Sequence, residues 1–444
     1  MLRMTRGVVC LAIMLAALAS VGTAGSAHGD DPTLITTGRI GFGLTDGEYV
    51  IWQEFDPDWH VSPTLYGALL DDRAPFVIGH PQSESGYYER VRIDDGWVVW
   101  VESDSPTEPV RWSLHAMHLA SGEAIVVTDL AYGVGQVVLS DSVVVWSEAS
   151  GEYTGPDTIR GMHLATGAML DIASDAAYIA TLAMSGSTLA WISQDGWELH
   201  HLQVRDIAAM SPTQTVTTVG PGVNGIALLD LEGDRLFWHE WYSTYADPAS
   251  SHVRIMTQRA GDSAPVMLVS GDDVGFGDAV GEQVFVQDGF RVLTINATTG
   301  ETVVLGHGSD IHSDGRYAFW HTSGMFGVAE SPQLVGADVQ TGSVHAFDFD
   351  GVARHVADGV IVWTQGVGAE RTLHAAHAAD ILPVDAQPQG PVPHQRPSWG
   401  EPLAGGTWNA ASTVATIPGA FGIGDVDLPW IVWSQNATPD TPDT

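Results

Sequence analysis

Residues 136–175 decide the fold, and they read QVVLSDSVVVWSEASGEYTGPDTIRGMHLATGAMLDIASD. Four short runs of β-branched and other apolar residues alternate with segments rich in Gly, Asp and Ser, which is typical of strands joined by hairpins. The runs are 137–139, 143–146, 159–164 and 169–172, and short turns lie at 140–142 and 165–167. Four such strands form a small antiparallel sheet that cannot bury both of its faces alone, so it requires neighbours of the same kind.

The same unit recurs along the chain, marked by a tryptophan on its second strand. Successive tryptophans from Trp52 to Trp238 are 48, 46, 45 and 47 residues apart. Phe285, in the run EQVFVQ, stands where one more tryptophan is expected. The tryptophans in this frame are Trp52, Trp100, Trp146, Trp191, Trp238, Trp320, Trp363 and Trp433. A repeat of about 40–50 residues with four strands indicates a β-propeller, and we expect these indoles to pack between blades.

The repeat also resembles a known family. The run DGWVVWVES at 95–103, followed by LHAMHLASGEAIVVT at 114–128, resembles the TolB-type propeller repeat of secreted bacterial and archaeal proteins. The resemblance extends over roughly residues 33–380 and implies an all-β propeller of four-stranded antiparallel blades. It implies no particular function, because such propellers carry unrelated activities.

Counting the units predicts eight blades. The nine candidate second strands exceed the usual maximum of about eight blades, so either one of them belongs to no blade or the last blade is partial. Seven blades is the alternative. The predicted first strands begin near Ile40, Val91, Val137, Leu182, Ile226, Asp278, His312 and Arg354. Residues 33–37 resemble a fourth strand with no strands before it, and residues 421–435 supply two more strands. We therefore expect the N- and C-terminal strands to pair and close the ring, which leaves no sheet edge open.

The chain divides into five segments. Residues 1–27 have the basic start, apolar stretch and small residues of a signal peptide. An uncleaved membrane anchor is the alternative, although the apolar stretch is short for a span of ~20 residues. The propeller is assigned to 28–382, a Pro-rich insertion or linker to 383–411, closing strands to 412–435 and a disordered tail to 436–444. The mature protein is therefore expected to be secreted, on the cell surface or periplasmic.

The composition restricts the partners. The formal net charge is −37, and all 17 basic residues are arginine. Such a surface repels nucleic acid and anionic lipid, so we predict no nucleic-acid partner and no membrane insertion of the mature chain. Cys10, in the leader, is the only cysteine, so the mature protein has no disulfide. The acidity suits solubility, including solubility in a salty medium.

Strand order predicts two unlike faces of the ring. Turns of two or three residues, between strands one and two and between strands three and four, form one face, here called the short-turn face. The loops after strands two and four are longer, and they form the opposite long-loop face. Binding sites favour loops on rigid scaffolds, and aromatic rings beside carboxylates and histidines suit sugars, peptides or cations. The predicted ligand-binding residues on the long-loop face are Trp59, His60, Glu102, Trp112, Tyr153, His239, Glu240, Trp241, Tyr242 and His321.

No catalytic set and no metal site is predicted. The sequence contains no Gly-x-Ser-x-Gly, no His-Glu-x-x-His and no phosphate-binding glycine loop. His115 and His118 are three apart on a strand, so their side chains point to opposite faces and cannot share a metal. The acidic run 272–278 offers oxygen ligands, but it lacks the spacing of an EF-hand loop. No cofactor is predicted, and calcium is the alternative.

Two functions fit this pattern. The first is a secreted, non-enzymatic binding or scaffolding propeller that recognises an extracellular protein or glycan through the long-loop face. The second is an extracellular hydrolase or lyase acting on a polysaccharide, with carboxylate and histidine at the mouth of the channel. Convergence of Glu102, Glu148, His239 and His321 on one cavity would favour the enzyme, and their scatter around the ring would favour the binding protein.

Overall fold

The computed structural model describes most of the chain between residues 33 and 382, and two short strands beyond it. The described residues are 33–55, 63–72, 74–81, 87–103, 111–130, 133–148, 157–174, 178–195, 199–220, 223, 225–244, 247–322, 333–366, 371–382, 421–423 and 433–435. The leader at 1–27, the Pro-rich segment at 383–411 and the tail at 436–444 lie outside them.

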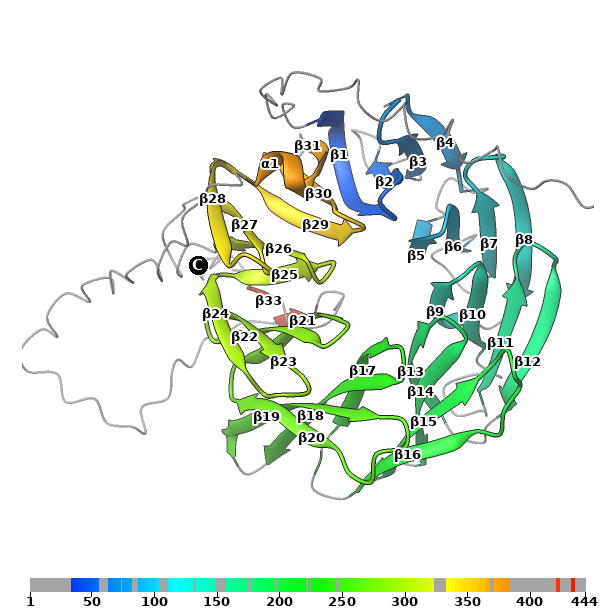
Figure 1. Ribbon diagram of the computed structural model, residues 1–444. Coiled ribbons are helices and arrows are strands. Elements are labelled where there is room, and N and C mark those ends of the chain that lie inside the picture. The colour runs from blue at the N-terminus through cyan, green and yellow to red at the C-terminus, as the bar shows by residue number, and fades with distance from the viewer. Residues whose placement is uncertain are drawn as a thin grey trace, which may run out of the picture.

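The strands follow the predicted four-strand units, here numbered as blades in chain order (Figure 1). Blade 1 contains β1 (Thr33–Thr45), β2 (Tyr49–Phe55), β3 (Thr64–Leu69) and β4 (Phe76–Gly79). Blade 2 contains β5 (Tyr87–Asp94), β6 (Trp97–Ser103), β7 (Trp112–His118) and β8 (Glu123–Leu130). Blade 3 contains β9 (Val134–Ser140), β10 (Val143–Glu148), β11 (Thr158–His163) and β12 (Ala168–Ser174). Blade 4 contains β13 (Tyr178–Ser185), β14 (Thr188–Asp195), β15 (Leu199–Asp206) and β16 (Gln214–Val219).

The second half of the ring repeats the pattern. Blade 5 contains β17 (Gly225–Glu232), β18 (Arg235–Thr244), β19 (Asp247–Arg259) and β20 (Val266–Gly271). Blade 6 contains β21 (Val274–Val280), β22 (Gln283–Asp288), β23 (Arg291–Asn296) and β24 (Thr302–His307). Blade 7 contains β25 (Ser309–Ser313), β26 (Tyr317–Thr322), β27 (Gln333–Asp338) and β28 (Ser343–Asp350). Blade 8 contains β29 (Val352–Ala357), β30 (Val360–Gln365) and β31 (Arg371–His377), followed by the helix α1 (Ala378–Ile381).

The ring is closed by the long first strand. Six sheets have four strands each, and a seventh has seven strands in the order β29-β30-β31-β1-β2-β3-β4. β1 serves two units, because residues 33–38 pair with β31 and residues 39–45 pair with β2. The ring therefore contains seven sheets but eight four-stranded units, and Figure 1 shows them arranged around one axis. The all-β propeller of four-stranded blades is confirmed, and the alternative count of seven corresponds to the sheets.

The partner of the N-terminal strand differs from the prediction. Residues 33–37 do act as a fourth strand, but they pair with β31 rather than with residues 421–435. Within the latter segment, β32 (Phe421–Ile423) and β33 (Trp433–Gln435) pair with each other in a separate two-stranded sheet. Closure by pairing of N- and C-terminal strands is therefore confirmed, with β31 as the C-terminal partner, and the described strands of 412–435 take no part in it. Three strands of blade 8 come from residues 352–377, and the N-terminal part of β1 is its fourth, outer strand.

The repeat tryptophans pack between blades, as expected. Trp146, Trp191, Trp238, Trp320 and Trp363 are fully buried. Each of eight hydrophobic clusters joins two neighbouring blades, and together they fill all eight interfaces of the ring. The core of the molecule is therefore a circle of inter-blade interfaces rather than one central cluster.

Blade 6 departs from the tryptophan frame. Counted from the preceding turn, Val286 occupies the tryptophan position, and Phe285 lies one residue earlier. Val286 packs toward blade 5 in the cluster that contains Phe237, as a tryptophan at this position would. Phe285 packs toward blade 7 in the cluster that contains Trp320. The assignment of Phe285 to the tryptophan position is therefore wrong, although both side chains are buried.

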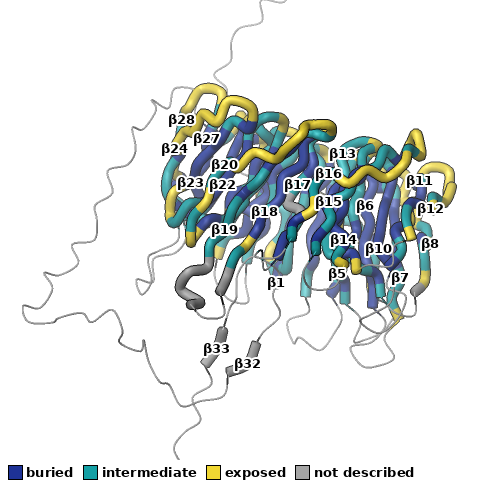
Figure 2. Tube along the Cα trace, turned by 90° about the horizontal axis from the view of Figure 1, so that it is seen from below, coloured by how far each residue is buried: buried dark blue, intermediate teal, exposed yellow. Residues whose placement is uncertain are grey.

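Hydrogen bonds between turns join the blades on the short-turn face. In seven interfaces, a backbone N–H at or beside the turn between strands one and two donates to a side-chain oxygen of the preceding blade. At the eighth interface the N–H of Thr45 donates to Nδ1 of His355 at 3.4 Å. The seven oxygen acceptors are Asp46, Asp94, Ser140, Ser185, Glu232, Asp278 and Asp314, and their donors are Gly96, Asp141, Gly186, Gly233, Gly281, Ser313 and Gly359, at 2.7–3.1 Å. Exposed turns lie along the upper edge of the ring in Figure 2, above buried strands.

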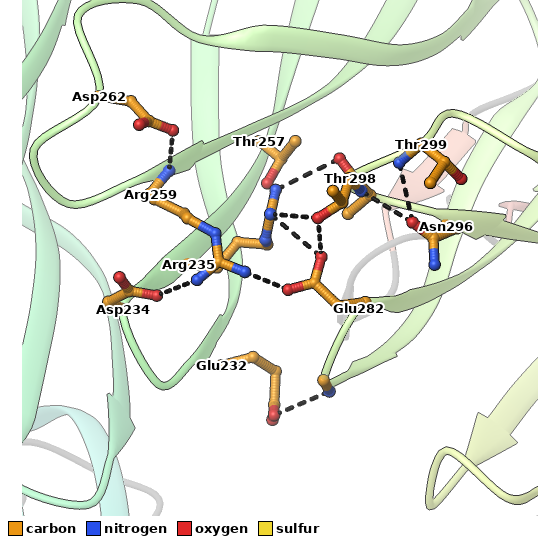
Figure 3. A network of polar contacts seen from close by, with 12 residues as sticks. Glu232, Asp234, Arg235, Thr257, Arg259, Asp262, Glu282, Asn296, Thr298 and Thr299 are labelled. Atoms are coloured by element: carbon orange, nitrogen blue, oxygen red, sulfur yellow. Dashed lines mark hydrogen bonds and ion pairs between the residues drawn. The ribbon is translucent and has the colours of Figure 1, made fainter.

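A network of ion pairs reinforces the interface between blades 5 and 6 on this face (Figure 3). Arg235 is buried, and its Nη2 lies 3.1 Å from Oε2 of Glu282 in the next blade. Arg235 also donates to the carbonyl oxygen of Ala297 at 3.3 Å. Arg259 contacts the same glutamate and pairs with Asp234 at 2.9 Å. A buried guanidinium requires such partners, so these polar groups hold two blades together.

Among the described residues, none of the helical segments is both long and apolar enough to cross a membrane.

Candidate functional site

The described members of the predicted site lie in three different blades. Each is near the end of a second strand or the start of a third, on the side of the long loops. Glu102 and Trp112 belong to blade 2, His239, Glu240, Trp241 and Tyr242 to blade 5, and His321 to blade 7. Trp59, His60 and Tyr153 lie outside the described residues.

In blade 2 the predicted residues pack within the blade. Glu102 is buried, and its Oε2 lies 3.6 Å from Nε2 of His115 on β7. Burial lowers the pKa of His115, and the imidazole stacks on Trp100 with a centroid distance of 5.3 Å. Trp112 is half-buried against the interface of blades 2 and 3 and meets Tyr87 edge-on at 5.9 Å. Trp112 therefore contributes to packing.

In blade 5, strand alternation separates the four predicted residues into two pairs. Glu240 and Tyr242 point to one side of β18, together with Trp238. Oε1 of Glu240 accepts a hydrogen bond from the indole of Trp238 at 3.1 Å, and its Oε2 accepts one from Tyr242 at 2.7 Å. Arg254 on β19 donates to the hydroxyl of Tyr242 at 3.1 Å and lies over its ring. This polar chain fixes Tyr242 at the end of an extended hairpin.

The other pair, His239 and Trp241, forms the most exposed aromatic feature among the predicted residues that the structure describes. The rings lie edge-to-face, with their centroids 5.0 Å apart. Burial lowers the pKa of His239 to about 4, so this imidazole is neutral at pH 7. Trp241 is 37% exposed and pairs with Gly225, the first residue of the inner strand β17. A Cβ at Gly225 would lie 1.8 Å from the indole, so only glycine permits this position of the ring.

In blade 7, His321 belongs to a polar cluster at the same end of the ring. Its Nε2 lies 3.4 Å from the hydroxyl of Ser309, and its Nδ1 lies 3.9 Å from Oδ2 of Asp310. His312 approaches the same carboxylate at 4.0 Å. Burial lowers the pKa of both histidines, against the opposing effect of Asp310. The imidazoles are therefore neutral at pH 7 and can donate or accept hydrogen bonds.

The four residues proposed as an enzymatic set come from four different blades, and no described contact joins one of them to another. Glu102, Glu148, His239 and His321 lie on β6, β10, β18 and β26, in four different blades. The hydrogen bonds and ion pairs described for Glu102, Glu148 and His321 are made within their own blades, whereas the charge of Arg354 in blade 8 also acts on His321. Glu148, for example, accepts a hydrogen bond from Trp146 at 2.9 Å and lies 3.5 Å from Arg160.

The structure shows a cavity on the short-turn face that the sequence analysis missed. It has a volume of about 940 Å³ and is surrounded by turns from six blades. Its lining includes seven carboxylates and two histidines: Asp46, Glu48, Asp94, Asp95, Asp141, Asp314, Asp358, His118 and His355. Several of these carboxylates accept the hydrogen bonds that link neighbouring turns, so their first role is structural.

No metal centre emerges within the part of the chain that the structure describes. It contains no group of three or more His, Cys, Asp or Glu side chains placed to hold a metal ion. The acidic run 272–278 is divided between a turn and β21, and Asp272 pairs with His252 at 3.1 Å.

Comparison with known proteins supports the fold alone. No family model and no curated protein matches the sequence. A prolyl endopeptidase structure aligns with a TM-score of 0.51 and 14% identity over 74% of this chain and 54% of that one. Dipeptidyl peptidase 4 of Porphyromonas gingivalis aligns with a TM-score of 0.53 and 10% identity over 78% of this chain and 59% of that one. An oligogalacturonate lyase in complex with manganese aligns with a TM-score of 0.42 and 15% identity over 79% and 91% of the two chains. The chain thus spans a little over half the length of the two peptidases.

Proposed function

We propose that this protein is an exported, non-enzymatic binding propeller that recognises an extracellular protein or glycan through its long-loop face. Export through the leader at 1–27 and the TolB-type character of the repeat are parts of the same proposal. The observation that carries it is Trp241, a partly exposed indole held in one orientation at the end of the longest described hairpin, β18–β19.

The surroundings of Trp241 suit binding. Gly225 leaves space for the ring, and His239 packs against its edge, so the indole loses little freedom when a ligand covers it. His239 is the hydrogen-bonding group on the same side as the indole, whereas Tyr242 and Arg254 add polar groups at the same end of the hairpin on the other side of β18. An aromatic plane beside hydrogen-bonding groups is the usual composition of sugar and peptide sites, and tryptophan is enriched among residues that dominate binding energy.

Binding is preferred over catalysis because no described contact joins the candidate acids and bases to one another. A general acid and base must act on the same substrate atoms within hydrogen-bond reach. Glu102, Glu148, His239 and His321 occupy four blades, and none of them is a described contact of another. The neighbouring carboxylates Glu102 and Glu148 are both buried in their strands.

The test begins with a panel of glycans and secreted proteins, screened with the mature protein in the presence and absence of calcium. For any ligand found, Trp241→Ala should weaken binding by about 2 kcal/mol, or roughly 30-fold, because it removes an aromatic anchor. The melting temperature should change little, because the side chain is partly exposed. Affinity is measured by isothermal titration calorimetry.

The matched control is Thr299→Ala, in a short turn on the opposite face. This variant should bind as tightly as the wild type. Unchanged affinity of the Trp241→Ala variant, together with a lowered melting temperature, would show that the indole serves packing and that the binding site lies elsewhere.

A further inference from the structure

The inner strands of blades 7 and 8 each place a charged residue at an irregularity. The pairing of β25 with β26 shifts register between Ser309 and His312, and that of β29 with β30 shifts between Ala353 and His355. Asp310 and Arg354 therefore sit at corresponding bulges of neighbouring blades. A β-bulge takes its residue out of the ladder and redirects the side chain, and bulges are common beside functional sites. Asp310 also has a positive φ of 60°, which is uncommon for a residue other than glycine.

A buried polar group beside these bulges lacks a hydrogen-bond partner among the described residues. Nδ1 of His321 is buried, and within the described part of the chain it has no hydrogen-bond partner. Its nearest acidic neighbour is Asp310, at 3.9 Å, which is beyond hydrogen-bond distance. Burial keeps His312 and His321 neutral at pH 7 by lowering the pKa of both. Each neutral imidazole carries one N–H donor, and so it can donate to an anion without itself carrying charge.

The guanidinium of Arg354 also makes fewer hydrogen bonds than it can donate. Its Nε donates to the hydroxyl of Thr364 at 3.0 Å, and its terminal nitrogens make no hydrogen bond to any described residue. Burial lowers the pKa of Arg354, and the positive charge of Arg371 lowers it further, whereas Asp310 raises it. The positive charge of Arg371 and the negative charge of Asp310 thus both act on Arg354, in a protein whose formal net charge is −37. This local excess of positive charge calls for a counter-charge.

We propose that Arg354, Arg371, His312 and His321 form a binding site for an oxyanion, the carboxylate or phosphate group of a small ligand, at the long-loop end of blades 7 and 8. The planar guanidinium matches two oxygens of either group at once. The neutral imidazoles add hydrogen-bond donors. This site is separate from Trp241 on blade 5, and the proposal does not depend on ligand binding at that residue.

The test is calorimetric titration of the mature full-length protein with succinate and, separately, with inorganic phosphate, at low and at physiological salt. The wild type should bind one of the two anions, and the arm that gives a signal identifies the oxyanion. Arg354→Gln should weaken that binding by about tenfold or more, because it removes a charged hydrogen-bond donor. The control is Arg316→Gln, which makes the same charge change on blade 7 at the short-turn face and should bind like the wild type.

Arg371→Gln provides a second reading if Arg354→Gln does not fold, and it should weaken binding in the same way. Absence of binding by the wild type in both arms would overturn the proposal. An equal loss of affinity in the Arg316→Gln variant would also overturn it, because the effect would then come from net charge alone.

Discussion

Asp230 and Asp278 occupy corresponding positions in the inner strands of blades 5 and 6. Asp230 pairs with Phe237 and Asp278 pairs with Phe285, and two residues separate each aspartate from the turn that follows its strand. Burial raises the pKa of Asp230 to about 7. Burial and the nearby charge of Asp230 raise the pKa of Asp278 to about 8. Two carboxyl groups in neighbouring strands thus hold protons near neutral pH that exposed carboxyl groups would release.

This pair should make stability fall as the pH rises. Both folded pKa values lie above the unfolded value of about 3.9, so the folded state retains protons that the unfolded chain has lost. The free energy of unfolding therefore falls as the pH rises from about 4 to 8. Between pH 6.5 and 9, the free energy of unfolding measured in urea should fall less for the Asp278→Asn variant than for the wild type. Asp272→Asn, an exposed control, should follow the wild type. Parallel curves for Asp278→Asn and the wild type would contradict the proposed protonation.

At the scale of elements, the sequence predicted the strands better than their register. The runs of apolar residues between Gly, Asp and Ser turns marked all eight inner strands, because strand and turn chemistry are local. The error at Phe285 has a physical cause. Both faces of each blade are buried, so the run Val-Phe-Val has no polar alternation to show which side chain faces which neighbour. Only the position of the preceding turn determines that register.

Ring closure also depends on a single element, β1. A mature chain that begins at Arg39 lacks residues 33–38 and leaves β31 as an open edge, so its melting temperature should fall clearly. A chain that lacks residues 421–435 should melt like the wild type, because β32 and β33 pair only with each other among the described strands. Thermal unfolding followed by circular dichroism measures both. The reverse order of stability would show that the C-terminal strands close the ring.

For the whole molecule, the ring geometry brings together turn residues that lie far apart in the sequence. The acidic cavity on the short-turn face draws residues from six blades, and each looked like an ordinary turn residue when considered alone. The site residues on the long-loop face were chosen by loop length and composition, which indicate a face but no contacts. The split of His239 and Trp241 from Glu240 and Tyr242 follows from strand alternation, and it was therefore available from the sequence.

The charge of the whole molecule gives a prediction about salt. A formal net charge of −37 produces mutual repulsion in the compact state, and salt screens it; the Debye length falls to ~10 Å at 0.1 M. The melting temperature should therefore rise as sodium chloride is added to a buffer of low ionic strength. A flat or falling melting temperature would indicate that the carboxylates are already compensated within the fold.

The central claim is that ligand binds on the long-loop face. Hydrogen–deuterium exchange of the mature protein, with and without a ligand from the panel, tests this claim most directly, because it reports on both faces in one measurement. The account predicts new protection in β18 and β19 near Trp241 and Tyr242, with unchanged exchange in the short turns at 120–122 and 298–300. Protection confined to those short turns, with none in β18 and β19, would contradict it.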